Sequence, residues 1–112
     1  MSSELPVLDR SVLRSSLGDD QQLIEEILEL FQTTTSDIIE SLEKAAYEGD
    51  LETVRKTAHS IKGSAANISA KAMQESMKDI EAACAKEDRE AVSERVRDSI
   101  REYNRLKLEI GR

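Results

Sequence analysis

The sequence contains few of the residues that interrupt or cross-link a chain. Its 112 residues include one proline, four glycines, one cysteine and one histidine, and aromatic residues make up 3%. Four glycines are too few for the many turns of an all-β protein, so helices are favoured. The single cysteine excludes an internal disulfide, and one histidine with one cysteine excludes the usual zinc ligand sets. We interpret Cys84 as a small buried apolar residue.

Long apolar runs and an excess of positive charge are missing too. No segment approaches the ~20 apolar residues that a membrane span needs, and the N-terminus lacks the pattern of a signal peptide. The formal net charge of −7 argues against nucleic-acid binding. No glycine-rich phosphate loop is present, so we expect no ATP site. We therefore expect one cytoplasmic domain over residues 1–112, monomeric and not itself an enzyme, that binds neither membrane nor nucleic acid.

Helix-forming residues at helical spacing make up most of the chain. Apolar residues recur every three or four positions in segments of about 20–47, 51–66, 70–86 and 87–110, and each segment is expected to be a helix. A shorter apolar segment from Pro6 to Leu17 predicts another helix, because proline is favoured in a first turn. Short connections between long amphipathic helices predict an all-α fold. The expected fold is an up-down antiparallel four-helix bundle with the short N-terminal helix across one end.

Some details of these helices are expected from single residues. The buried face of the first long helix should comprise Ile24, Ile27, Leu28, Phe31, Ile38, Leu42 and Ala45. Asn67 tolerates the left-handed conformation that ends helices, so it should end the helix of residues 51–66. Ser69 is expected to cap the helix that follows.

The only histidine, His59, lies beside an apolar stripe on a helix. The stripe consists of Leu51, Val54, Ala58, Ile61, Ala65 and Ile68. His59 lies about 100° round the helix from Ala58, so it is next to the packed face and not within it. The residues that share its strip of surface are Arg55, Lys62, Gly63 and Ala66. A lone histidine is usually a packing or surface residue, but cations one turn to either side favour a functional interpretation.

The surroundings of His59 are locally basic and contain an unusual glycine. Residues 1–50 carry 12 acidic and 3 basic side chains, residues 51–112 carry 11 and 13, and no acid lies between Glu52 and Glu75. Such a surface suits a phosphoryl group or the acidic pocket of a partner. Glycine inside a helix costs roughly 1 kcal/mol relative to alanine. Either a neighbouring helix packs closely at Gly63 or a partner approaches the imidazole there, and we favour the partner.

The segment A-H-S-I-K-G-S-A-A-N-I, followed by M-x-x-x-M-x-x-I-E, resembles the histidine-containing phosphotransfer (HPt) domain of bacterial multistep phosphorelays. The resemblance implies that His59 is the phosphorylated residue, that Lys62 and Gly63 are the characteristic pair after it, and that Ile80-Glu81 is the later pair. It implies a bundle that shuttles phosphate between His59 Nε2 and aspartates of receiver domains, in response regulators or a hybrid sensor kinase. Mg²⁺ is then expected on the receiver, with no cofactor on this chain. The family usually has glycine where this chain has Ser69.

Two side chains have expected roles in such a transfer. Lys62, expected to be exposed, can neutralise part of the charge on the phosphoryl oxygens. Glu81 either orients the second ring nitrogen of His59 or simply faces water. Two other functions stay open: the phospho-accepting domain of a chemotaxis-type histidine kinase, and a non-catalytic helical adapter in which His59 is incidental. The chain could also be a fragment of a hybrid histidine kinase.

Overall fold

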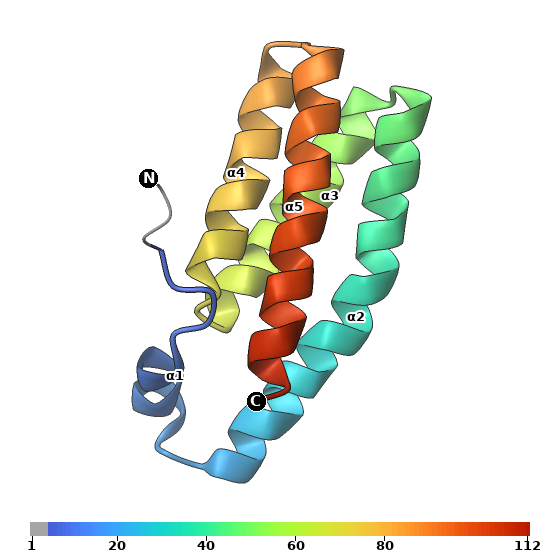
Figure 1. Ribbon diagram of the computed structural model, residues 1–112. Coiled ribbons are helices and arrows are strands. Elements are labelled where there is room, and N and C mark those ends of the chain that lie inside the picture. Colours follow the sequence, from blue (N-terminus) through green and yellow to red (C-terminus); the bar gives the residue numbers. More distant parts are fainter. Residues whose placement is uncertain (1–4) are drawn as a thin grey trace.

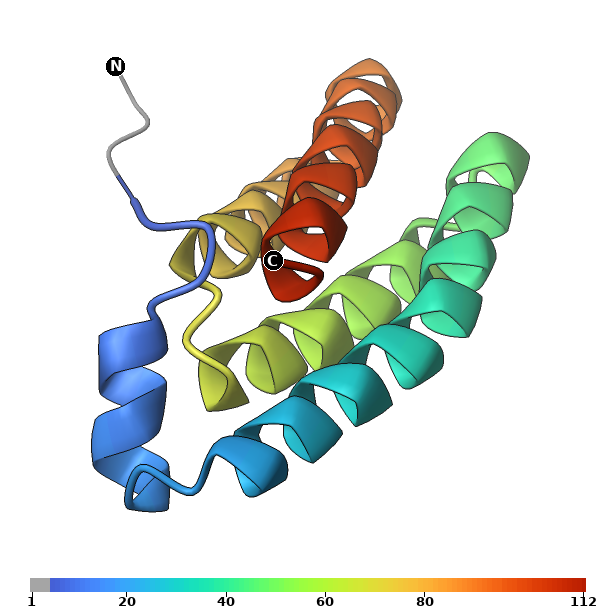
Figure 2. The same ribbon diagram turned by 60° about the horizontal axis from the view of Figure 1, so that its bottom comes forward.

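The computed structural model describes residues 5–112, which form five α-helices and no strand. The helices are α1 (Arg10–Leu17), α2 (Gln21–Glu48), α3 (Leu51–Asn67), α4 (Lys71–Ala85) and α5 (Arg89–Ile110). The four long helices form a closed bundle, in which each packs against the next and α5 packs against α2 (Figure 1). The short helix α1 lies across the end at which α2 begins (Figure 2). The predicted all-α bundle with an extra N-terminal helix is confirmed.

Aspartates begin most of the helices. The residues that precede α1, α2, α3 and α5 each accept a hydrogen bond from the N–H three positions on, and they are Asp9, Asp20, Asp50 and Asp88. These carboxylates satisfy N–H groups that have no partner inside the helix. The glycine after α1 and the one after α2 adopt left-handed conformations, which allows the chain to reverse within two or three residues. Short connections of this kind force neighbouring helices to be antiparallel.

The start of α1 differs from the prediction. The helix begins at Arg10 and not at Pro6. The carbonyl of Pro6 accepts a hydrogen bond from the N–H of Ala72 at 3.0 Å, and the N–H of Asp9 donates to the carbonyl of Ser69 at 3.0 Å. Residues 6–8 are therefore held against the start of α4 by long-range backbone bonds that compete with helix formation.

The apolar stripes form one core between the helices. The stripe of α3 is buried as expected, with only Leu51 half-exposed, and Cys84 is buried as expected too. On the same face of α4, Met73, Met77 and Ile80 are also buried. On α2 the predictions of Ile27 and Ile38 as buried residues are wrong, because both are half-buried, and Ile39 is buried instead. Thr35 occupies a buried position one turn earlier. The residue four positions after it, Ile39, then continues the stripe.

The connection between α3 and α4 also differs from the prediction. Asn67 remains helical, and Ser69 is the residue with a left-handed backbone, at φ 59°. The N-cap of α4 is Ala70, which offers no side-chain hydrogen bond. Part of that missing cap is supplied by the carbonyl of Pro6, which accepts from Ala72. The N-terminal segment thus takes the place of a capping side chain.

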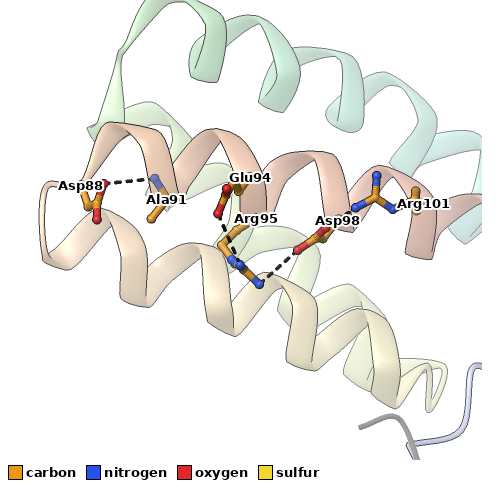
Figure 3. A network of polar contacts seen from close by, with 6 residues as sticks. All are labelled: Asp88, Ala91, Glu94, Arg95, Asp98 and Arg101. Atoms are coloured by element: carbon orange, nitrogen blue, oxygen red, sulfur yellow. Dashed lines mark hydrogen bonds and ion pairs between the residues drawn. The ribbon is translucent and has the colours of Figure 1, made fainter. Parts of the chain in front are cut away.

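The outer surface of α5 carries basic residues that form ion pairs with acids of the same helix. Figure 3 shows Arg95 between Glu94 and Asp98, with Arg101 on the other side of Asp98. These ion pairs lie along one exposed helix, where each contributes up to about 0.5 kcal/mol. Within residues 5–112, no helix is long and apolar enough to cross a membrane.

Candidate functional site

His59 projects from the middle of α3 into solvent. Its neighbours Ala58 and Ile61 are buried in the core, which fixes the rotation of α3 and turns position 59 outward. The side chain of His59 is 68% exposed. A ring on a rigid, packed helix is held in place and remains open to another molecule.

Glu81 connects His59 to Lys62. It lies on α4 next to Ile80, which is fully buried and fixes the rotation of that helix. The Oε2 atom of Glu81 is 2.9 Å from Nδ1 of His59, and its Oε1 atom is 2.6 Å from Nζ of Lys62. Of the two interpretations for Glu81, the structure supports contact with the ring, because the carboxylate is only 20% exposed and both oxygens are engaged.

Lys62 is less exposed than the sequence suggested. Its side chain is 31% exposed because the ammonium group turns towards α4 and onto Glu81. The ammonium group can donate three hydrogen bonds, so one bond to Glu81 leaves two for other acceptors. Lys62 is therefore a partly buried member of a three-residue cluster and not a freely mobile surface lysine.

The electrostatics of the cluster determine which ring nitrogen is free. Burial disfavours ionisation of Glu81, but hydrogen bonds from Lys62 and His59 outweigh it, so the pKa of Glu81 lies below its ordinary value. An ionised carboxylate only accepts hydrogen bonds, so Nδ1 of His59 carries a proton and donates it to Glu81. In the neutral ring, Nε2 then holds the free lone pair. It is the ring nitrogen that can attack an electrophile.

Gly63 leaves open space beside the ring. The residue is exposed, and a Cβ atom built on it meets no other atom within 4 Å. The interpretation that a neighbouring helix packs closely at this glycine is therefore wrong. The space belongs to the outer surface, where a molecule approaching His59 would lie.

A shallow apolar hollow of about 220 Å³ lies between α2 and the C-terminal part of α3, beginning at Ser64, the residue after Gly63. Its lining consists of Ile27, Leu30, Phe31, Thr34, Thr35, Ser64, Asn67 and Ile68. Leu30 is 67% exposed, although leucine is among the residues that are most often buried. No pattern discussed for the sequence predicted this surface. The available signal was a leucine placed off the buried stripe of α2, next to Phe31.

The cluster around His59 suits acceptance of a group and not its activation. It provides a nucleophilic nitrogen, a carboxylate that orients the ring and a cation. Among the residues that the structure describes, no group of three or more His, Cys, Asp or Glu side chains is placed to hold a metal ion. An electrophilic donor brought by another molecule would complete the chemistry.

Comparison with known proteins identifies a family and a solved structure with a similar fold. Residues 26–112 match the family model described as Hpt domain. No curated protein sequence matches the chain significantly. Histidine-containing phosphotransfer protein B (HptB) from Pseudomonas aeruginosa PAO1 has a similar crystal structure, with a TM-score of 0.86 and 24% sequence identity. The similarity covers 95% of this chain and 92% of that one, and at this identity it shows a shared fold.

Proposed function

Because the chain belongs to the Hpt domain family, whose members carry phosphoryl groups in phosphorelays, we propose that His59 is the residue that accepts and donates the phosphoryl group. The observation that carries this proposal is the bond from His59 Nδ1 to Glu81, which leaves Nε2 free on an exposed side chain. The chain is a carrier and not a catalytic kinase domain. We extend the proposal to one domain over residues 1–112, of which residues 1–4 lie outside the described part.

The proposed reaction is a transfer between an aspartate of a receiver domain and His59. The lone pair of Nε2 attacks phosphorus, the Nε2–P bond forms, and the bond from phosphorus to the aspartate oxygen breaks. The aspartate leaves as a carboxylate, and the ring, which keeps its proton on Nδ1, becomes a phosphorylated imidazolium. No proton moves in this step, so the positive charge that develops on the ring lies against the Glu81 carboxylate 2.9 Å away.

Lys62 is proposed to act on the charge of the phosphoryl group. Phosphoryl transfer asks the protein for in-line positioning and for neutralisation of charge on the three equatorial oxygens. The ammonium group of Lys62 is held next to the ring through Glu81 and retains two N–H donors. Lys62 also keeps Glu81 ionised, since its hydrogen bond favours the charged carboxylate.

The proposed partner is a receiver domain, in a response regulator or in a hybrid sensor kinase. Gly63 would allow it to approach the ring, and the apolar hollow beside Gly63 would contact an apolar part of its surface. The receiver would bring Mg²⁺, which neutralises charge on the transferring phosphoryl group. The chain would act as a cytoplasmic monomer with no cofactor of its own.

The test of this function is transfer from phosphorylated receiver domains to the purified protein. Wild type should acquire a label that is acid-labile and base-stable, as expected for phosphohistidine. His59→Gln should acquire none. Its free energy of unfolding should change by no more than about 0.5 kcal/mol, as is usual for surface substitutions, so its melting temperature should change little.

The control for this test is Ser60→Ala, which changes the next exposed residue of α3 and should keep the label. Label retained in His59→Gln would reject His59 as the phosphorylated residue. A wild type that takes no label from any receiver would instead favour an adapter without phosphotransfer.

A further inference from the structure

The basic residues around His59 differ in whether their charge is already paired. Lys62 binds Glu81 at 2.6 Å, and Lys56 lies 3.5 Å from Glu52. Arg55 is also exposed and takes part in no ion pair within residues 5–112. Among these three cations of α3, Arg55 is thus the one whose charge is not committed.

Three of the five arginines of α5 bind an acid of the same helix, whereas Arg89 and Arg97, like Arg55, take part in no ion pair within residues 5–112. Arg95 and Arg101 both bind Asp98 on the same helix (Figure 3). Arg105 binds Glu102 at 3.1 Å in the same way. These three arginines each have an acid three residues away, which is within reach on a helix. The acid three residues before Arg55 is Glu52, and it is bound by Lys56 instead.

Arg55 lies one turn before His59 on the same strip of α3. Side chains of a helix lean towards its N-terminus, so the ring of His59 lies over the turn that contains Arg55. Arg55 also lines a shallow hollow of about 340 Å³, and the lining of this hollow includes Glu52, Cys84, Glu87 and Arg89. The one acid of this hollow outside α3 is Glu87, which makes no ion pair with Arg55.

We propose that Arg55 binds the phosphoryl oxygens once His59 is phosphorylated. This inference rests on the proposed function of His59. The guanidinium group presents several N–H donors in a planar fork that matches two oxygens of a phosphoryl group. Lys62 lies one turn after His59 on α3, and Arg55 lies one turn before it. Together they flank the phosphoryl group, and Arg55 does so without breaking an existing ion pair.

The inference can be tested without any receiver domain. Phosphoramidate donates its phosphoryl group to imidazoles: the Nε2–P bond forms, the P–N bond of the reagent breaks, and ammonia leaves. The labelled protein is then titrated by ³¹P NMR to obtain the pKa of the phosphoryl group on His59. A nearby guanidinium favours the dianion and lowers that pKa, so Arg55→Ala should raise it by roughly half a unit at low salt.

Two matched variants make the titration specific. Arg55→Lys keeps a positive charge and should restore part of the shift. Lys56→Ala removes the neighbouring cation, which is already bound to Glu52, and should leave the phosphoryl pKa at its wild-type value. Circular dichroism of each variant checks that the bundle is intact.

The outcomes separate this inference from the function on which it rests. A phosphoryl pKa that is the same in wild type and Arg55→Ala overturns the contact, even though His59 is labelled. An equal shift of the phosphoryl pKa in Lys56→Ala also overturns the contact, because the loss of any nearby positive charge would then have the same effect. Failure of phosphoramidate to label His59 would count against the proposed function itself.

Discussion

At the scale of single residues, Glu81 couples the ring of His59 to the charge of Lys62. One carboxylate accepts from both side chains and is mostly covered by protein. It therefore fixes which ring nitrogen is protonated, and it would meet the positive charge that the proposed phosphorylation places on the ring. A carboxylate in this role must stay ionised, and the lowered pKa of Glu81 keeps it so over the physiological range.

Glu81→Gln should show a pH-dependent loss of stability. The pKa of Glu81 is lower in the folded protein than the ordinary 4.5. Ionised Glu81 therefore contributes its full stabilisation of the fold above pH 4.5, and this stabilisation is lost as pH falls through the lower pKa of the folded protein. The variant should be less stable than wild type at pH 7, by about 1 kcal/mol at most because one partner is exposed. Urea unfolding at several pH values should show the difference shrinking below about pH 4.5.

The control for this measurement is Glu40→Gln, which removes an exposed carboxylate of α2 that makes no ion pair among the described residues. It should show no such pH-dependent difference. A difference for Glu81→Gln that persists unchanged to pH 3 would mean that the ionised pair does not stabilise the fold.

The sequence indicated these residues but not their contacts. His59 could be placed beside the apolar stripe because the spacing of Val54, Ala58 and Ile61 fixes the rotation of one helix. Whether Glu81 faces the ring depends on how α4 is rotated and shifted against α3, which no pattern within one helix determines. The same reason explains why Lys62 was expected to be exposed, since its partner comes from another helix.

At the scale of elements, the connection between α3 and α4 carries a local cost. Ser69 has a left-handed backbone at φ 59°, a conformation that costs a residue with a Cβ atom roughly 1–2 kcal/mol. Its carbonyl binds the N–H of Asp9, and its neighbour Ala70 begins α4 without a side-chain cap. The turn is thus held by the N-terminal segment, which explains why local sequence signals did not predict it.

Replacing Ser69 by glycine should stabilise the protein. Glycine adopts the left-handed conformation without strain, so the substitution removes the backbone strain of Ser69. The free energy gained in this way exceeds the roughly 0.4–1 kcal/mol lost because glycine has greater freedom in the unfolded chain. We expect a net gain of roughly 0.5 kcal/mol in the free energy of unfolding. Ser41→Gly, in the exposed interior of α2, should instead destabilise by roughly 0.5 kcal/mol, because the helix propensity of serine lies between those of alanine and glycine. Destabilisation of Ser69→Gly to the same degree would show that the serine side chain holds the turn.

At the scale of the whole molecule, net charge and local charge have opposite signs. The chain carries −7 overall, and 12 of its 23 acidic residues lie in residues 1–50. The strip of α3 around His59 is basic, and it faces away from the core that α3 shares with α2 and α4. An acidic partner would therefore be repelled by the molecule at a distance and attracted by this strip at close range. Screening shortens the range of both effects, to about 10 Å at 0.1 M salt.

We expect the attraction to dominate the encounter with a receiver. The second-order rate of transfer should fall several-fold between about 0.05 M and about 0.5 M NaCl, because close charges steer docking more than a distant net charge does. Rapid-quench transfer under conditions of excess unlabelled carrier measures this rate. Arg55→Gln and Arg97→Gln change the net charge equally, but Arg97 lies on α5, which packs against α2 and α4. Only Arg55→Gln should weaken the salt dependence; a transfer rate that rises with salt would show instead that the overall charge of −7 governs the encounter.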